Sequence, residues 1–301
     1  MFHYGTKKLM RFSPDFVFTS KLDTPYEPNA RNLVIHNDED GTDWDAESWM
    51  AELSDDPEIV DLLWCVIGAC VRGNVKWGKM ALLYSERGNN GKGTLCELIR
   101  QVVGVGRCAS IPLALFGQDF QLEPLTRAKV IVVDENDVGV FIDKASILKA
   151  IVTHDRFPLN RKFLNPISMT FYGFMVQCVN EIPRYRDRSN SMYRRQLAIP
   201  MTKNFEGVER RYIKDDYITR PEVRQYVLWR VLQGSFYELP EPQACKDLLD
   251  EMKVANDPVR DFWREFAGEF AWDLLPFAFL YDLYRAWFEK TNPKGSPLGR
   301  N

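Results

Sequence analysis

The stretch from residue 80 to residue 99 constrains the fold more than any other part of this chain. It runs from apolar residues 80–84 into a small-residue loop that carries one lysine, and then into an amphipathic helix. Glycines in such a loop let backbone N–H groups point inward, the helix presents its positive end to an anion, and the lysine can reach the β- and γ-phosphates of a nucleotide. The stretch therefore predicts a phosphate-binding loop made by Gly88, Asn89, Asn90, Gly91, Lys92, Gly93 and Thr94.

Two positions of this loop depart from the usual phosphate-binding pattern. Glu86 stands where the pattern has its first glycine, and Gly93 stands where a Ser or Thr usually ligates magnesium. Thr94, the next residue, is then the candidate Mg²⁺ ligand. For the loop taken alone, the alternative is a glycine-rich turn that joins a core strand to a helix.

Composition places the chain among soluble globular proteins and limits how it could bind nucleic acid. Of its 301 residues, 45% are apolar and 27% are charged, which suits one large domain or several small ones. The formal net charge of −3 excludes a uniformly basic surface. Any contact with DNA must therefore come from local basic clusters.

Cysteine usage and hydropathy favour a cytoplasmic protein that neither crosses nor anchors to a membrane. The six cysteines include no C-x-x-C pair and lie mostly in apolar runs, and the chain has only three histidines. We therefore expect reduced, buried thiols and no zinc site. Neither a signal peptide nor an apolar span of about 18 residues is present.

An acidic pair follows the next strongly apolar run. The β-branched residues 130–133 precede Asp134 and Glu135. Such a run predicts a buried parallel strand, and ligands bind at the carboxyl ends of parallel strands in open α/β sheets. Asp134 would belong to the Mg²⁺ shell, and Glu135 would orient or deprotonate the water that attacks ATP. For the pair alone, the alternative is a strand end with two solvated acids.

A third apolar run, residues 173–179, predicts a strand that ends at Asn180. A side-chain amide at this strand tip, beside the acidic pair, could hydrogen-bond both the γ-phosphate and the attacking water. We therefore expect Asn180 to sense whether the γ-phosphate is present.

Residues 156–172 alternate apolar and polar side chains on both sides of Asn165-Pro166, which predicts a β-hairpin. Cations beside an exposed aromatic ring at a hairpin tip suit single-stranded DNA, with the cations on phosphates and the ring on a sugar or base. For this segment alone, the alternative is an ordinary hairpin with a solvated basic turn. The residues at its centre are Arg161, Lys162 and Phe163.

An arginine-rich segment lies just before the last predicted strand. Residues 184–195 contain five arginines, and apolar residues 196–200 follow them. So many guanidinium groups need anions nearby. Acidic side chains could supply these anions in surface ion pairs. The other candidate is the γ-phosphate of a nucleotide bound to a neighbouring subunit, because inserted arginines neutralise such a phosphate during phosphoryl transfer.

The flanking segments differ in character. Residues 1–50 are rich in turn-formers and indicate a lead-in segment rather than a domain. A helix is predicted at 57–71, beginning at Asp56-Pro57 and ending at Gly73. From residue 221 the pattern is helical. The helices predicted there lie at 221–233, 242–253, 257–270 and 276–289.

Taken together, these segments resemble the superfamily 3 helicases, specifically the helicase module of phage and plasmid primase-helicases that includes the poxvirus uncoating-factor type. The resemblance covers most of the chain and is carried by Asn90-Gly91-Lys92-Gly93-Thr94, Val179-Asn180-Glu181-Ile182-Pro183-Arg184, Tyr193-Arg194-Arg195 and Asn256-Asp257-Pro258-Val259. It implies the α/β fold class, with an AAA+-like P-loop NTPase core and a mostly parallel sheet at 76–205. A lead-in with a helical collar would occupy 1–75, and a truncated helical, winged-helix-like region 206–301.

The resemblance also implies a ring, usually a hexamer, with ATP and Mg²⁺ bound between subunits. One subunit would contribute Lys92, Thr94, Asp134, Glu135 and Asn180. The next would contribute an arginine finger, either Arg194 or Arg195. The tips formed by Arg161, Lys162 and Phe163 would line the central channel and move single-stranded DNA.

The leading hypothesis is an ATP-dependent DNA helicase or translocase that acts on forked DNA. The alternative is an ATP-dependent origin-melting or loading factor without processive unwinding. A small-molecule kinase with the same loop is disfavoured by the arginine cluster and the Asp134-Glu135 pair. Because no polymerising site precedes the loop, we expect a fragment or stand-alone helicase whose primase lies elsewhere.

Overall fold

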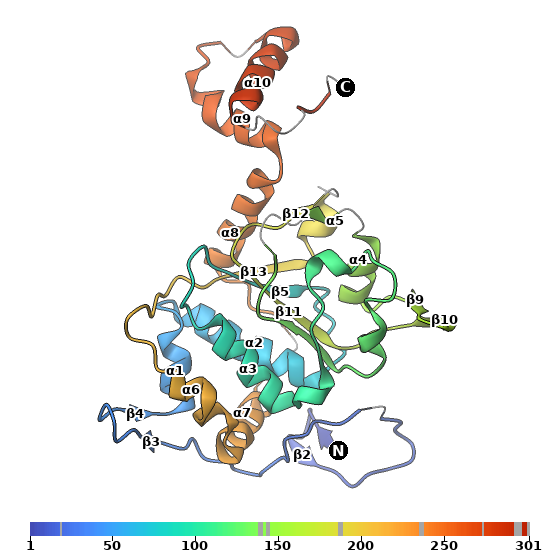
Figure 1. Cartoon of the computed structure of the whole chain (residues 1–301), viewed down its shortest axis with the longest axis vertical. Helices are drawn as coiled ribbons and strands as arrows, with labels where there is room; N and C mark the ends of the chain where they lie inside the picture. The colour runs from blue at the N-terminus through green and yellow to red at the C-terminus, as the bar shows by residue number, and fades with distance from the viewer. Residues whose placement is uncertain are drawn as a thin grey trace.

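The centre of the molecule is a five-stranded parallel sheet flanked by helices (Figure 1). Its strand order is β13-β5-β11-β7-β6, and every pairing in it is parallel. The bounds are Gln196–Pro200 for β13, Met80–Tyr84 for β5, Phe174–Val179 for β11, Val130–Val133 for β7 and Cys108–Ala109 for β6. The expected α/β class with a parallel sheet is confirmed. This computed structural model describes residues 1–18, 20–137, 141–142, 145–185, 189–234, 238–272, 274–291 and 297–299.

The central strands are buried on both faces because their side chains are almost entirely apolar. Every residue of β7 and β11 is buried, as is typical of parallel strands covered by helices on both sides. Alternate residues of β5 enter different cores: Ala81 and Leu83 join one, and Met80 and Leu82 join the other. The sheet therefore separates two apolar cores.

Helices cover both faces of this sheet. On one face, α2 (Pro57–Arg72), α3 (Lys92–Val103) and α7 (Pro221–Gln233) contribute to a single core. On the other face, α4 (Ser146–Val152) and α8 (Gln243–Ala255) contribute to the second core. The packing around the sheet thus includes α7, which belongs in sequence to the region 206–301.

Local sequence signals fix the ends of α2 and α3. The carboxylate of Asp56 accepts a hydrogen bond from the N–H of Glu58, and Pro57 is the first residue of α2. Gly73 ends α2 with a φ of 63°, and Gly104 ends α3 with a φ of 111°. Both are backbone conformations that favour glycine. The helix predicted at 57–71 is confirmed.

The amino-terminal part contains short strand pairs and one helix that the sequence did not predict. The antiparallel pairs are β1 (Phe2–His3) with β2 (Lys8–Leu9), and β3 (Ile35–His36) with β4 (Asp43–Trp44). The unpredicted helix α1 spans Ala46–Glu52, with Trp49 and Met50 buried. Asp45 caps it by accepting hydrogen bonds from backbone N–H groups of its first turn.

The predicted hairpin exists as β9 (Phe157–Arg161) and β10 (Leu164–Met169). Lys162 and Phe163 form its turn, as expected. The sequence alternation suggested that Asn165-Pro166 divides the two strands. The pair lies instead inside β10, where the pairing register shifts. A proline lacks the N–H that a regular ladder needs, which accounts for this bulge.

The carboxy-terminal helices α9 (Pro258–Phe266) and α10 (Phe277–Thr291) extend away from the sheet beyond α8 (Figure 1). They share a small core of Phe262, Tyr284, Trp287 and Phe288. Asp257 caps α9 as predicted, but α9 ends at Phe266 and a short 3-10 turn follows, so the helix is shorter than the predicted 257–270. Gly268 lies in that turn, and glycine disfavours a continued helix.

The remaining elements are short. They are β8 (Phe141–Ile142), β12 (Arg184–Tyr185), α5 (Asn190–Tyr193), α6 (Arg211–Asp215), and 3-10 turns at Val105–Arg107, Leu113–Leu115, Glu123–Thr126, Tyr217–Thr219 and Ala267–Glu269. Among the helices of the described residues, none is long and apolar enough to cross a membrane.

Candidate active site

The loop between β5 and α3 has a backbone that requires glycine at one point. Gly91 precedes α3 with a φ of 83°, and a Cβ there would stand 2.5 Å from Leu53 Cδ2. The buried Asn90 fixes the loop, because its amide donates to the Arg87 carbonyl at 2.5 Å and its Oδ1 accepts from the Lys92 N–H at 3.2 Å. Asn90 thus holds the loop shape from inside.

Lys92 is the first residue of α3, and its side chain turns inward. Nζ donates to Asn180 Oδ1 at 2.6 Å, to the Val179 carbonyl at 3.1 Å and to the Ser85 carbonyl at 3.3 Å. Burial lowers the pKa of this amine. Two side chains predicted from separate motifs, Lys92 and Asn180, therefore meet at the carboxyl ends of the neighbouring strands β5 and β11.

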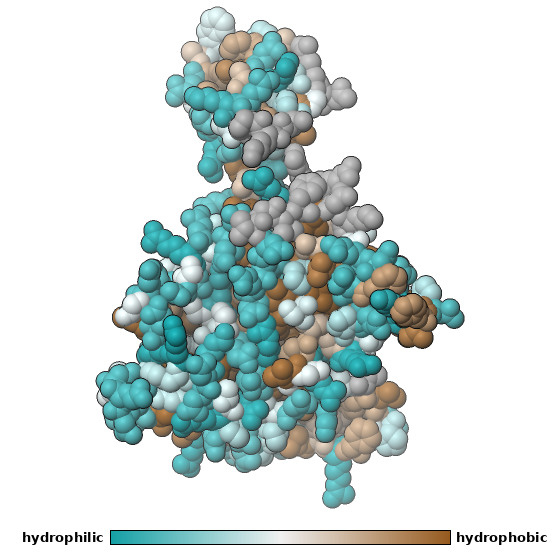
Figure 2. All heavy atoms as spheres, viewed as in Figure 1, coloured by the Kyte–Doolittle hydropathy of each residue, from teal (hydrophilic) through white to brown (hydrophobic). Residues whose placement is uncertain are grey.

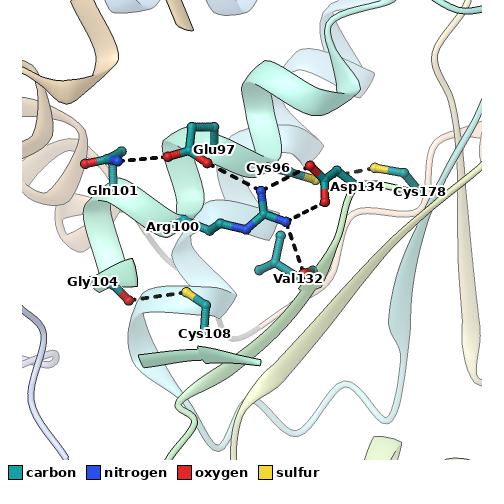
Figure 3. Close-up of polar contacts among 9 residues, drawn as sticks. All are labelled: Cys96, Glu97, Arg100, Gln101, Gly104, Cys108, Val132, Asp134 and Cys178. Carbon is teal, nitrogen blue, oxygen red and sulfur yellow. Dashed lines mark hydrogen bonds and ion pairs between the residues drawn. The ribbon is translucent and has the colours of Figure 1, made fainter. Parts of the chain in front are cut away.

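Asp134 follows β7 and is held by an arginine that the sequence did not single out. Arg100 of α3 donates from Nη2 to Asp134 Oδ1 at 2.6 Å and from Nη1 to Oδ2 at 3.3 Å (Figure 3). Burial raises the pKa of the Asp134 carboxyl, but the hydrogen bonds and charge of Arg100 outweigh it, so the pKa lies below its usual value. Asp134 is therefore ionised at neutral pH.

The residues that follow Asp134 have contrasting environments. Glu135 is exposed and makes no hydrogen bond or ion pair with another residue that the structure describes. Asn136 is buried: its amide donates to Gln177 Oε1 at 3.0 Å and to the Cys178 carbonyl at 2.9 Å, and its Oδ1 accepts from a backbone N–H. Asn136 therefore ties the end of β7 to β11 and was missed by sequence reasoning.

A cavity of about 340 Å³ opens beside the loop. Its lining includes Asn89, Gly91 and Thr94 from the loop, Phe205 after β13, and Lys214 of α6. Lys214 Nζ lies 3.7 Å from the position that a Cβ on Gly93 would take, and its charge adds to the lowering of the Asp134 pKa. Gly88, the first glycine of the loop, is exposed.

Asp134 and Thr94 present oxygen atoms of the kind that Mg²⁺ takes as ligands. Asp134 offers an ionised carboxylate and Thr94 a hydroxyl. The described part of the chain has no group of three or more His, Cys, Asp or Glu side chains that could hold a metal. Mg²⁺ at nucleotide sites usually takes one or two protein ligands besides phosphates, so a dedicated protein cage is not needed.

The hairpin of β9 and β10 projects from one side of the molecule, at the right in Figure 1. Phe163 has a φ of 60° and is 93% exposed, and Figure 2 shows apolar residues gathered at this projection. Lys162 Nζ lies 5.3 Å from the centroid of the Phe163 ring. Arg161 bends back, donating from Nε and Nη2 to the Asn165 carbonyl at 3.3 and 3.0 Å.

The arginines before β13 lie at the opposite edge of the sheet from the loop. The Met80 N–H donates to the Arg195 carbonyl at 2.8 Å, so both residues mark the amino ends of their strands. Arg194 is exposed, and Arg195 donates from Nη1 to the Ser191 carbonyl at 2.6 Å. The length of the five-residue strand β5 lies between these arginines and the loop of the same chain. At about 3.3 Å per residue this length is about 16 Å. Arg186 and Arg188 lie outside the described residues.

Fold and site together define a class: a layered α/β protein whose parallel sheet carries a lysine, an amide and an acid at its carboxyl edge. Residues 83–195 match a family described as "Family of unknown function (DUF5906)", and this match spans nearly all the candidate site. Residues 255–301 match the family described as "Poxvirus D5 protein-like". The second match confirms the expected resemblance to the poxvirus-type carboxy-terminal region, while the superfamily 3 assignment stays a prediction.

Solved structures with a similar fold include "The A form apo structure of NrS-1 C terminal region-CTR", with a TM-score of 0.50 and 13% identity. That similarity covers 87% of this chain and 70% of the other. "The apo structure of NrS-1 C terminal region (305-718)" has a TM-score of 0.50 at 12% identity, covering 86% of this chain and 71% of the other. These similarities establish a shared fold. No curated protein sequence matches this chain.

Proposed function

We propose that this chain is an ATP-driven DNA translocase that separates strands during phage, plasmid or mobile-element replication in the cytoplasm of a host bacterium. The observation that carries the proposal is the 2.6 Å hydrogen bond from Lys92 Nζ to Asn180 Oδ1. It joins a glycine-containing loop to a strand-tip amide at the edge where open α/β sheets bind ligands. The match of residues 255–301 to the poxvirus-type family supports a role in replication.

The chemistry that these residues would perform follows from their positions. Lys92 would exchange oxygen partners inside the protein for phosphate oxygens and neutralise their charge. Thr94 and Asp134 would hold Mg²⁺, which supplies further neutralisation of the phosphoryl group when bound. Glu135, exposed beside Asp134, would orient the attacking water and accept its proton. Asn180 would hydrogen-bond the γ-phosphate.

Oligomerisation is part of the proposal because the arginines cannot serve their own loop. Arg194 and Arg195 lie at the amino end of β13, and Lys92 lies beyond the carboxyl end of β5. A head-to-tail ring would bring the arginine edge of one subunit to the loop edge of the next. This geometry supports ATP hydrolysis between subunits of a homo-oligomer, which we propose is a hexameric ring.

The hairpin supports single-stranded DNA as the transported partner. Its tip presents Lys162 beside the 93% exposed ring of Phe163, and Arg161 lies next to them. A cation contacts phosphates and a ring stacks on bases without sequence preference, as a translocating channel requires. A primase domain or protein is the proposed partner in replication.

A strand-separation assay on forked DNA tests the proposal. Strand release with ATP, and none with ADP or a non-hydrolysable analogue, is expected. ATP-dependent DNA binding without release would instead favour an origin-melting or loading factor. Release that continues in Lys92→Ala would contradict the assignment of the site.

A further inference from the structure

The carboxylate of Asp134 is bound on both oxygens by one guanidinium. Arg100 donates to Oδ1 at 2.6 Å and to Oδ2 at 3.3 Å, and Figure 3 shows the two groups facing each other. Two-point contacts of this kind fix the plane of a carboxylate as well as its charge. The acid that we assign to Mg²⁺ is therefore already engaged by a cation.

Arg100 itself is held in place by further contacts. Nη2 also donates to the Val132 carbonyl at 3.3 Å, and Nη1 to Glu97 Oε2 at 3.4 Å. Gln101 in turn donates to Glu97 Oε1 at 2.8 Å. The side chain of Arg100 is only 15% exposed, whereas that of Asp134 is 42% exposed. The guanidinium is thus the more fixed partner, and the carboxylate is the one that solvent reaches.

A divalent cation would have to share this carboxylate with Arg100. The guanidinium occupies the oxygens and repels a second positive charge, so it opposes a bare ion more than an ion that arrives with phosphates. Arg100 has a second acidic partner in Glu97. If one of the two hydrogen bonds from Arg100 to Asp134 is broken, the guanidinium therefore still has a carboxylate beside it. Such an arrangement would favour a metal ion that arrives with nucleotide phosphates over a free one.

We propose that Arg100 is a positioning residue that lowers the affinity of Asp134 for free Mg²⁺, so that the site retains the ion only together with nucleotide phosphates. The proposal rests on the nucleotide site described under the proposed function. It assigns a role to a residue that no motif in the loop or the acidic pair includes.

The test measures metal binding rather than turnover. Mn²⁺ replaces Mg²⁺, and its free concentration is followed by electron paramagnetic resonance with the protein alone and with a non-hydrolysable ATP analogue. Arg100→Gln is expected to bind Mn²⁺ about fivefold more tightly than the wild type without nucleotide. Arg100→Lys keeps the charge but loses the two-point contact, so it should shift affinity in the same direction by less.

Arg107→Gln is the matched control, because Arg107 pairs with Asp23 at 3.4 Å rather than with Asp134. It should leave Mn²⁺ binding unchanged, and thermal unfolding checks that each variant is folded. Unchanged or weaker Mn²⁺ binding in Arg100→Lys, or in a folded Arg100→Gln, would overturn the proposal. Asp134→Asn distinguishes the role of Arg100 from the metal role of Asp134 in the proposed function. If this variant still binds Mn²⁺ normally in the presence of the ATP analogue, Asp134 is not a metal ligand and the proposed function is wrong at that point.

Discussion

Lys92, the first residue of α3, and Asn180, the residue after β11, meet through a 2.6 Å hydrogen bond although they belong to different motifs. The lysine amine uses oxygen partners of the protein itself, namely Asn180 Oδ1 and the carbonyls of Ser85 and Val179. A phosphate that binds here must replace at least one of them. Where the displaced partner is Asn180 Oδ1, the binding of the proposed nucleotide would free the side chain of Asn180.

Replacing Lys92 with Ala should weaken ATP binding at least about tenfold, because a charge-assisted hydrogen bond contributes about 1.5–3 kcal/mol. Calorimetric titration with ATP and Mg²⁺ measures the loss. Lys79→Ala is the control. The Lys79 amine forms an ion pair with Glu241, with 3.2 Å between Nζ and Oε2, and this pair does not involve the loop. Wild-type affinity in Lys92→Ala would exclude the loop as the phosphate site.

Two substitutions at Asn180 should have different effects. Asn180→Ala removes the contact to the γ-phosphate but leaves Lys92 available, so hydrolysis should fall while ATP affinity changes little. Asn180→Asp places a carboxylate against the Lys92 amine and repels phosphate, so ATP affinity should fall as well. Titration and single-turnover hydrolysis separate the two results. Equal behaviour of the two variants would argue against a sensing role.

Glu135→Gln should bind ATP and fail to cleave it, because the amide retains the shape of the side chain but cannot accept a proton from water. Single-turnover hydrolysis and titration measure the two properties. Glu181→Gln, an exposed acid next to Asn180, serves as the control and should hydrolyse ATP normally. Lost binding in Glu135→Gln would instead indicate a structural role.

Lys162→Ala should leave basal hydrolysis intact and remove its stimulation by single-stranded DNA. The tip contributes phosphate contacts, so DNA binding by the wild type should weaken as salt rises, and the variant should show a smaller salt dependence. Lys8→Ala, in β2 at the amino-terminal end, is the control. An unchanged response to DNA in Lys162→Ala would contradict the channel role.

Mixtures of inactive variants test whether the site lies between subunits. Lys92→Ala lacks a working loop, and Arg194→Ala or Arg195→Ala would lack the finger. If arginines act on a neighbour, mixing Lys92→Ala with the finger variant should restore part of the hydrolysis, because some interfaces then combine two intact halves. The arginine whose loss is rescued is the finger. No rescue in either mixture would argue against a shared site.

The sheet and its carboxyl edge were predictable because the signals for them are local. Apolar and β-branched runs predict β5, β7 and β11. Because these strands are parallel, the side chains that follow them lie at one edge of the sheet. The helix α1 escaped prediction because it is only seven residues long, too short to show a helical repeat, and it packs against α2, which lies outside its own sequence.

The partners of the candidate residues were not predictable because they come from distant parts of the chain. Arg100 looks like an ordinary helix cation in sequence, and only the packing of α3 against β7 brings it to Asp134. Asn136 likewise finds its hydrogen-bond partners in β11. Lys214 reaches the cavity beside the loop because α6 packs on α3. Such long-range contacts leave no periodic pattern.

The most direct test of the account is ATP hydrolysis by this chain with and without single-stranded DNA, at low and moderate salt, with Lys92→Ala as the blank. The account predicts hydrolysis that DNA stimulates strongly, and stimulation that weakens as salt rises. Hydrolysis at the same rate with and without DNA at both salt concentrations, and absent in the blank, would contradict a DNA motor and leave an ATPase of another kind.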